Sequence, residues 1–81
     1  MSEFDRLVGT QLKTMDQLLD LQTKLERYQM MQRSLKDGAE HQEIQERIQQ
    51  TQQELRGVQE MFEQQTKQII DSFQKEKFIH N

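Results

Sequence analysis

Hydrophobic residues recur along the chain at alternating spacings of three and four, the heptad pattern of helices that pack against each other. In the first half the pattern runs through Phe4, Leu7, Gln11, Thr14, Leu18, Leu21, Leu25, Tyr28, Gln32 and Leu35. In the second half it runs through His41, Ile44, Ile48, Thr51, Leu55, Val58, Phe62, Gln65, Ile69 and Ser72. Ser2 followed by Asp5 is a capping pair that can satisfy exposed backbone N–H groups at the first helix start. The pattern predicts two long amphipathic α-helices.

The two heptad patterns are out of phase, and the residues between them carry signals for a turn. After Leu35 the next strong apolar position is Ile44, which does not continue the spacing of the first half. Gly38 tolerates the backbone angles that end a helix. Asp37, with Glu40 three residues later, reads as a capping box that starts a new helix. One helix running through a local winding defect is the alternative.

We therefore predict an all-α fold, an antiparallel two-helix coiled-coil hairpin that occupies residues 1–81 as one unit. The first helix is expected over about 3–36, with the turn at Lys36–Ala39. The second helix is expected over about 38–77, and residues 78–81 are expected to form a frayed tail because chain ends usually fray.

Folding at this turn predicts a register in which Leu21 lies opposite Leu55, so that facing residue numbers sum to 76. The intrachain seam then consists of Leu7, Leu18, Leu21, Leu25, Tyr28, Ile48, Leu55, Val58, Phe62 and Ile69. Gln11 meets Gln65, and two amides that bond each other inside an apolar seam would penalise slipped registers. Opposite charges also face each other along one edge, in the pairs Glu3 with Lys75 and Lys24 with Glu54.

A second set of apolar residues lies beside the predicted seam, towards the end that carries the chain termini. The set comprises Val8, Leu12, Met15, Leu19, Met61, Ile70 and Phe73. Two helices cannot cover both the seam and this second set, so we expect a partner to cover it. The expected partner is a second copy, giving a homodimeric four-helix bundle with the hairpins parallel or antiparallel. The alternative is a regulatory binder that captures a helix of another cytosolic protein.

The composition favours helices and disfavours several classes of protein. Sixteen of the 81 residues are glutamine, and none is proline or cysteine. The lack of cysteine rules out a disulfide framework and fits a cytoplasmic location. No apolar run approaches the ~20 residues that span a bilayer, and no secretion signal opens the chain, so we expect no membrane binding. The net charge of −3 disfavours nucleic acid as a partner.

Combinations of residues that would support catalysis or metal binding do not stand out. His41 has no second histidine at helical spacing, and His80 lies in the tail, so we predict no metal site. Without a phosphate-binding loop or a nucleophile–base pair, we also predict no catalytic residue, no cofactor and no enzymatic activity. The alternative is a helical phosphatase that would use acid–amide pairs four residues apart. These pairs are Glu46 with Gln50 and Glu60 with Gln64.

The stretch EFDRLVGTQLKTMDQLLDLQTKLERYQ, residues 3–29, resembles the start of the small YgaB-like proteins of Bacillus-type bacteria. The length of 81 residues and the lack of cysteine fit the same family. This resemblance implies a small bacterial cytosolic helical protein, and it transfers no functional residue. The sporulation phosphatases related to Spo-zero-E carry Ser-Gln-Glu-Leu-Asp on their second helix. The second helix here reads QQTQQELRGVQEM and lacks the aspartate, which weakens the phosphatase alternative.

Overall fold

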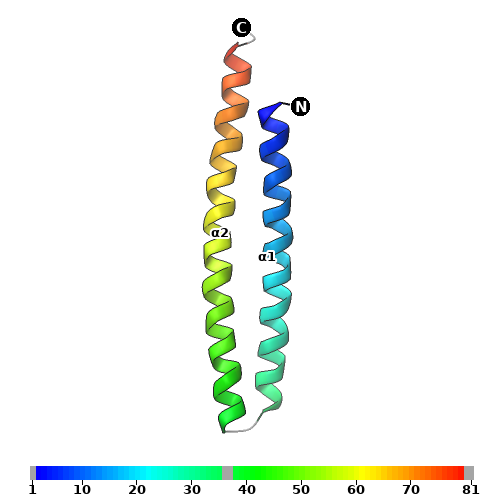
Figure 1. Ribbon diagram of the computed structural model, residues 1–81, viewed down its shortest axis with the longest axis vertical. Coiled ribbons are helices and arrows are strands. Elements are labelled where there is room, and N and C mark those ends of the chain that lie inside the picture. The colour runs from blue at the N-terminus through cyan, green and yellow to red at the C-terminus, as the bar shows by residue number, and fades with distance from the viewer. Residues whose placement is uncertain (1, 36–37, 80–81) are drawn as a thin grey trace.

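The computed structural model describes the backbone of residues 2–35 and 38–79, and the side chains of residues 2–35 and 38–75. Helix α1 spans Glu3–Ser34 and helix α2 spans Ala39–Ile79. The two helices lie side by side and antiparallel, and α2 extends beyond the first turn of α1 (Figure 1). The hairpin measures 65 × 16 × 13 Å. The predicted all-α hairpin is confirmed, and the single continuous helix is wrong.

Helix α1 begins and ends with local hydrogen bonds. Ser2 has an extended backbone, and its hydroxyl accepts the Asp5 N–H at 3.2 Å, as the capping pair predicts. At the other end the Leu35 N–H donates to the carbonyls of Met31 at 3.2 Å and Gln32 at 3.3 Å. This shared donor tightens the last turn, and Leu35 then adopts an extended backbone. Helix α1 therefore ends at Ser34, two residues before the predicted end.

Helix α2 begins directly after a glycine with a left-handed backbone. Gly38 has a φ of 138°, a value that residues with a Cβ rarely adopt, and its carbonyl accepts the Gln42 N–H at 3.2 Å. Glu40 lies in the first turn of α2, where a carboxylate complements the partial positive charge of the helix end. The predicted cap residue Asp37 lies outside the described residues.

The bounds of α2 differ from those that the sequence predicts. The helix starts at Ala39 instead of residue 38, and it continues to Ile79 instead of ending at residue 77. Its last turns contain lysine, glutamate and glutamine and lack glycine and proline, so nothing in the local sequence ends the helix earlier. Residues 80 and 81 of the predicted tail lie outside the described residues.

The interior of the hairpin is a thin seam between the two helices. The structure places all ten predicted seam residues at buried or half-buried positions. The most enclosed side chains are Thr14, Ile44, Ile48 and Thr51. The two threonine hydroxyls donate within their own helix, from Thr14 to the Thr10 carbonyl at 3.3 Å and from Thr51 to the Arg47 carbonyl at 2.8 Å. Burial therefore leaves neither hydroxyl without a hydrogen bond.

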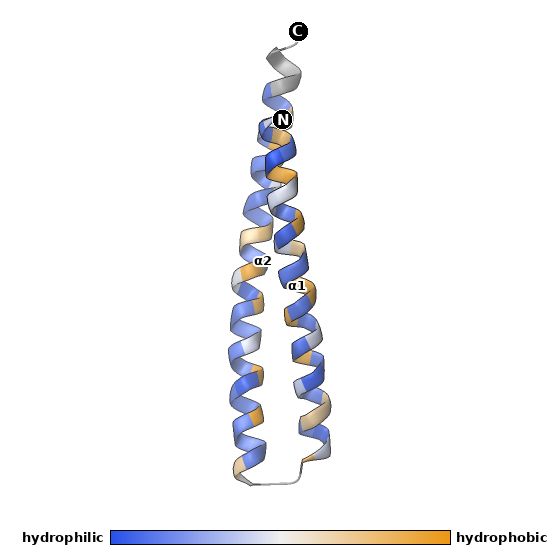
Figure 2. Cartoon of the chain, turned by 45° about the vertical axis from the view of Figure 1, so that its right-hand side comes forward, coloured by the Kyte–Doolittle hydropathy of each residue, from blue (hydrophilic) through white to orange (hydrophobic). Residues whose placement is uncertain are grey.

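The hairpin exposes a large surface for its size. Hydrophobic positions alternate with hydrophilic ones along both helices and do not gather into a thick core (Figure 2). The chain of 9.8 kDa exposes 6724 Å². A compact monomer of this mass would expose about 5,200 Å². Two helices alone thus leave roughly 1,500 Å² more surface in water than a compact domain does.

Neither helix carries, within the described residues, an apolar stretch long enough to cross a bilayer.

Candidate interaction surface

Three contacts between the helices define the register of the hairpin. The rings of Phe4 and Phe73 lie with their centroids 6.0 Å apart, tilted by 51°. The side chain of Gln11 bonds Thr66, and that of Gln32 bonds Gln45. The residue numbers in each pair sum to 77, one more than the register predicted from the sequence. The contacts therefore place the two helices within one residue of the predicted alignment.

The predicted bond between Gln11 and Gln65 is wrong. The Gln11 amide nitrogen donates instead to the Phe62 carbonyl at 3.2 Å and to the Thr66 hydroxyl at 2.6 Å. A side-chain amide has two hydrogens, and these two acceptors use both of them. The Gln65 Oε1 atom is left buried without a hydrogen-bond partner. Sequence reasoning missed Thr66, although its position four residues after Phe62 allows the hydroxyl to bond that carbonyl, at 3.0 Å.

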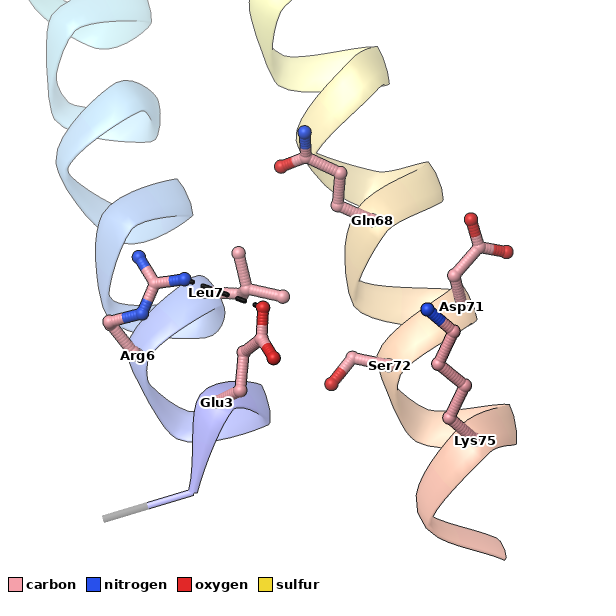
Figure 3. A pocket seen from close by; sticks show the side chains of 7 residues that line it. All are labelled: Glu3, Arg6, Leu7, Gln68, Asp71, Ser72 and Lys75. Carbon is pink, nitrogen blue, oxygen red and sulfur yellow. Dashed lines mark ion pairs between the residues drawn. The ribbon is translucent and has the colours of Figure 1, made fainter. Parts of the chain in front are cut away.

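One side of the hairpin carries a polar groove of about 460 Å³ near the chain termini (Figure 3). Its lining residues are Glu3, Arg6 and Leu7 from α1, and Gln68, Asp71, Ser72 and Lys75 from α2. The two acidic and two basic side chains leave this groove without net charge. It therefore has no strong preference for an anion or a cation.

The opposite side of the same end is apolar. Successive residues of an α-helix are rotated by about 100°, so Leu12 lies about half a turn from Glu3. On α2, Phe73 lies about 160° from Lys75 by the same geometry. Because Glu3 and Lys75 line one groove, the apolar side chains of both helices share the other side. We name this surface the terminal apolar face, and it consists of Val8, Leu12, Met15, Leu19, Ile70 and Phe73.

Large apolar side chains stand in water on this face. Val8 is half-buried, and the other five side chains are between 40% and 60% exposed. On α1 the four residues lie within about 40° of Val8, so they form one straight stripe. Towards the turn the stripe ends at Gln22 and Glu26, which are exposed and polar. The face is thus limited to the end of the hairpin that carries the chain termini.

Met61 does not belong to the terminal apolar face, contrary to the sequence prediction. It is nine residues from Ile70 on a continuous helix, which places it about 180° away. Met61 lines a different groove, together with Gln17, Asp20, Leu21, Glu54 and Val58. Met61 matches the terminal apolar face in its distance along the hairpin but not in its direction around α2.

Comparison with known proteins connects this hairpin to a family. The model of the YgaB-like protein family matches residues 3–76. The chain belongs to the YgaB-like family. A relative from Bacillus subtilis (strain 168), described as "Uncharacterized protein YgaB", is 42% identical over 76 residues. The match covers 90% of this chain and 67% of that relative. No solved structure matches the chain. The resemblance inferred from residues 3–29 is therefore confirmed.

Charged residues of this YgaB-like hairpin pair within helices. The ion pairs found in the described part of the chain are Arg6 with Glu3 at 3.5 Å and Arg47 with Glu43 at 3.1 Å. Glu3 and Lys75 share the polar groove, as the predicted register requires, but the Glu3 carboxylate pairs with Arg6 (Figure 3). All four paired side chains are exposed, so these pairs contribute little stability.

Arg47 also has a shifted pKa. A hydrogen bond with the Tyr28 side chain, followed by the bond with the Glu43 carboxylate, raises the pKa of Arg47 above its usual value. Tyr28 lies on α1 and Arg47 on α2, so the influence on this pKa comes from the other helix. The guanidinium is already charged at neutral pH, so the raised pKa of Arg47 adds no pH-sensitive group.

The residues considered for catalysis in the YgaB-like chain do not form an enclosed site. Glu46, Gln50, Glu60 and Gln64 are all exposed on α2. His41 is half-buried beside the turn. No group of three or more histidine, aspartate or glutamate side chains in the described residues is placed to hold a metal ion. The terminal apolar face is thus the feature that most needs a functional explanation.

Proposed function

We propose that this chain is a non-enzymatic, cytoplasmic interaction module that pairs with a second copy of itself through the terminal apolar face, forming a four-helix bundle. One observation carries the proposal. Five large apolar side chains on one side of the hairpin are about half exposed, and neither helix of the same chain covers them. Helical hairpins commonly bury such a stripe by forming bundles.

The energy available from covering this face is of the same size as the cost of association. Full burial of a large apolar side chain is worth about 1.5–3 kcal/mol, so covering the exposed half is worth roughly 1 kcal/mol. Five such residues supply roughly 5 kcal/mol per chain, and a dimer gains this from both chains. This gain must exceed the loss of translational and rotational freedom on association, which costs about 4–15 kcal/mol. A stable dimer therefore needs most of the face to be matched by apolar side chains of the second copy.

The test is the solution mass of a variant with charges on the face. Leu12→Glu with Met15→Glu should convert a dimer into a monomer, measured by light scattering over a range of concentrations. The matched control is Met30→Glu with Met31→Glu, which makes the same change at two methionines that are 65% and 45% exposed near the turn. The control should keep the wild-type mass. A monomeric wild type, or an unchanged mass for the face variant, would contradict the proposal.

A second candidate function is capture of a helix from another protein by the same face. The stripe at Val8, Leu12, Met15 and Leu19 has the i, i+4, i+7, i+11 spacing with which helices anchor in apolar grooves. A photoreactive side chain at Leu12, cross-linked in cells that make the chain, separates the two candidates. Cross-links only to a second copy favour self-association. A cross-link to another protein that disappears with Leu19→Glu favours the binder.

A further inference from the structure

We infer that the two hairpins pair with their turns at opposite ends, so that α1 of one copy lies against α1 of the other. The inference rests on the proposed self-association and specifies its geometry. Two face-to-face arrangements of identical hairpins have two-fold symmetry. An axis along the hairpin places both turns at the same end and α1 against the partner's α2. An axis across the hairpin places the turns at opposite ends and α1 against the partner's α1.

The apolar stripe of α1 is self-complementary in the second arrangement. The gaps between its four residues are four, three and four, so the spacing is the same in either direction along the helix. Two antiparallel copies therefore align with Val8 against the partner's Leu19 and Leu12 against the partner's Met15. Symmetry repeats both contacts, which is the property of an isologous interface. All four α1 residues of each copy then meet apolar side chains.

The boundaries of the stripe fit the same alignment. The next layer on either side would place Asp5 against the partner's Gln22. Both residues are exposed in the hairpin and both are polar. The apolar contact thus begins and ends at the same layers on both chains, and a polar layer closes each end. This matches the apolar centre and polar rim of stable protein interfaces.

The arrangement with both turns at the same end matches fewer apolar residues. Symmetry then fixes the heights of the facing residues by the register within one hairpin, in which facing numbers sum to 77. The nearest residues on the Ile70 side of α2 lie one position from that register, so Val8 would face the partner's Ile70, but Leu12 would face the partner's Thr66. Met15 would face the partner's Glu63, whose carboxylate would lose water without gaining an opposite charge. Two symmetry-related apolar contacts then replace four.

Contacts between the two α2 helices are also favourable when the turns lie at opposite ends. Arg56 lies on the same side of α2 as Ile70, about 40° away around the helix, and is exposed. The two-fold axis brings Phe73, which is 54% exposed, within about one helical turn of the partner's Arg56. An arginine over an aromatic ring is attracted by the electrons of the ring face. The α2 side of the interface therefore covers Phe73.

The test measures distances between single labels on the two chains of the dimer. The chain has no cysteine, so Glu40→Cys and Gln74→Cys each give one label position on an exposed residue outside the apolar face. With turns at opposite ends, labels at residue 40 should be about 70 Å apart and labels at residue 74 about 30 Å apart, at 1.5 Å per residue. With turns at the same end, both distances should be roughly 10–20 Å. Pulsed electron spin resonance resolves these values.

Cysteine pairs in mixed dimers give an independent test. Oxidation of Val8→Cys mixed with a mass-tagged Leu19→Cys should yield a mixed disulfide-linked dimer. Val8→Cys mixed with tagged Ile70→Cys should yield several-fold less. Distances of about 10–20 Å at both label positions, or preferential linkage of residues 8 and 70, would overturn the inference while leaving the dimer in place. A monomeric mass without any interchain distance would overturn the proposed function as well.

Discussion

The side-chain amide of Gln11 on α1 donates to the hydroxyl of Thr66 on α2 across 2.6 Å, and the Thr66 hydroxyl in turn donates to the Phe62 carbonyl. These two hydrogen bonds give partners to the Gln11 amide and the Thr66 hydroxyl in one polar layer of the seam. It also leaves the neighbouring Gln65 Oε1 buried without a donor. An unpaired buried acceptor costs about 1–3 kcal/mol. The hairpin therefore keeps a polar layer that reduces its stability, and this layer can be tested directly.

Replacing Gln65 by leucine should stabilise the hairpin. The variant Gln65→Leu removes the unpaired acceptor and places an apolar side chain of similar size in the half-buried position. We expect the free energy of unfolding to rise by about 1–3 kcal/mol, measured by urea denaturation at a fixed chain concentration. The control Gln64→Leu changes an exposed neighbour and should stay within about 0.5 kcal/mol of wild type. A less stable Gln65→Leu protein would show that the amide has a partner in solution.

Removing the Thr66 hydroxyl should weaken the contact between the helices. In Thr66→Val the Gln11 amide keeps the Phe62 carbonyl as an acceptor and loses the hydroxyl. We expect the free energy of unfolding to fall by about 0.5–1.5 kcal/mol. Thr10→Val is the control, because the exposed Thr10 hydroxyl bonds only the Arg6 carbonyl within α1 and does not reach α2. If Thr66→Val and Thr10→Val lower the free energy of unfolding equally, the bond between the helices adds nothing to stability.

The three glycines should respond differently to alanine. Gly9 and Gly57 lie inside helices, and a Cβ added to either meets no atom within 4 Å. Gly9→Ala and Gly57→Ala should therefore raise the free energy of unfolding by about 0.5–1 kcal/mol each. Gly38→Ala should lower it by about 1–2 kcal/mol, because the φ of 138° is strained for any residue with a Cβ. Thermal unfolding ranks the three variants, and a stabilising Gly38→Ala would show that the turn has another conformation.

Two isoleucines of α2 should separate hairpin stability from association. Ile48 is buried in the seam, so Ile48→Ala should lower the free energy of unfolding by about 2–5 kcal/mol. Ile70 is half exposed on the terminal apolar face. Ile70→Ala should therefore change the free energy of unfolding of the isolated hairpin little and should weaken the dimer. Circular dichroism and a dilution series followed by light scattering measure the two effects. If Ile70→Ala unfolds the chain as strongly as Ile48→Ala, the face belongs to the core of the single hairpin.

The heptad spacing allowed much of the fold to be predicted because it depends only on neighbours along one helix. The burial of Thr14 and Ile48 follows from such local periodicity, and the cap at Ser2 follows from the residue types at the helix start. The end of α2 was less predictable, since glutamate, lysine and glutamine allow the helix to continue to Ile79 without requiring it. The direction of Met61 is already contained in the sequence, because nine residues of continuous helix place it about 180° from Ile70.

The sequence by itself determined that this chain forms two helices, that they meet along one seam, and that α1 carries a second apolar stripe. Each of these follows from residue spacing on a helix of known pitch. Only the tertiary structure decided that Gln11 bonds Thr66 and leaves Gln65 unpaired. A shift of one residue between the helices moves a neighbouring layer by about 1.5 Å, which is enough to exchange one hydrogen-bond partner for another. Residue spacing along one helix cannot predict that shift, because the shift arises from the packing of the two helices against each other.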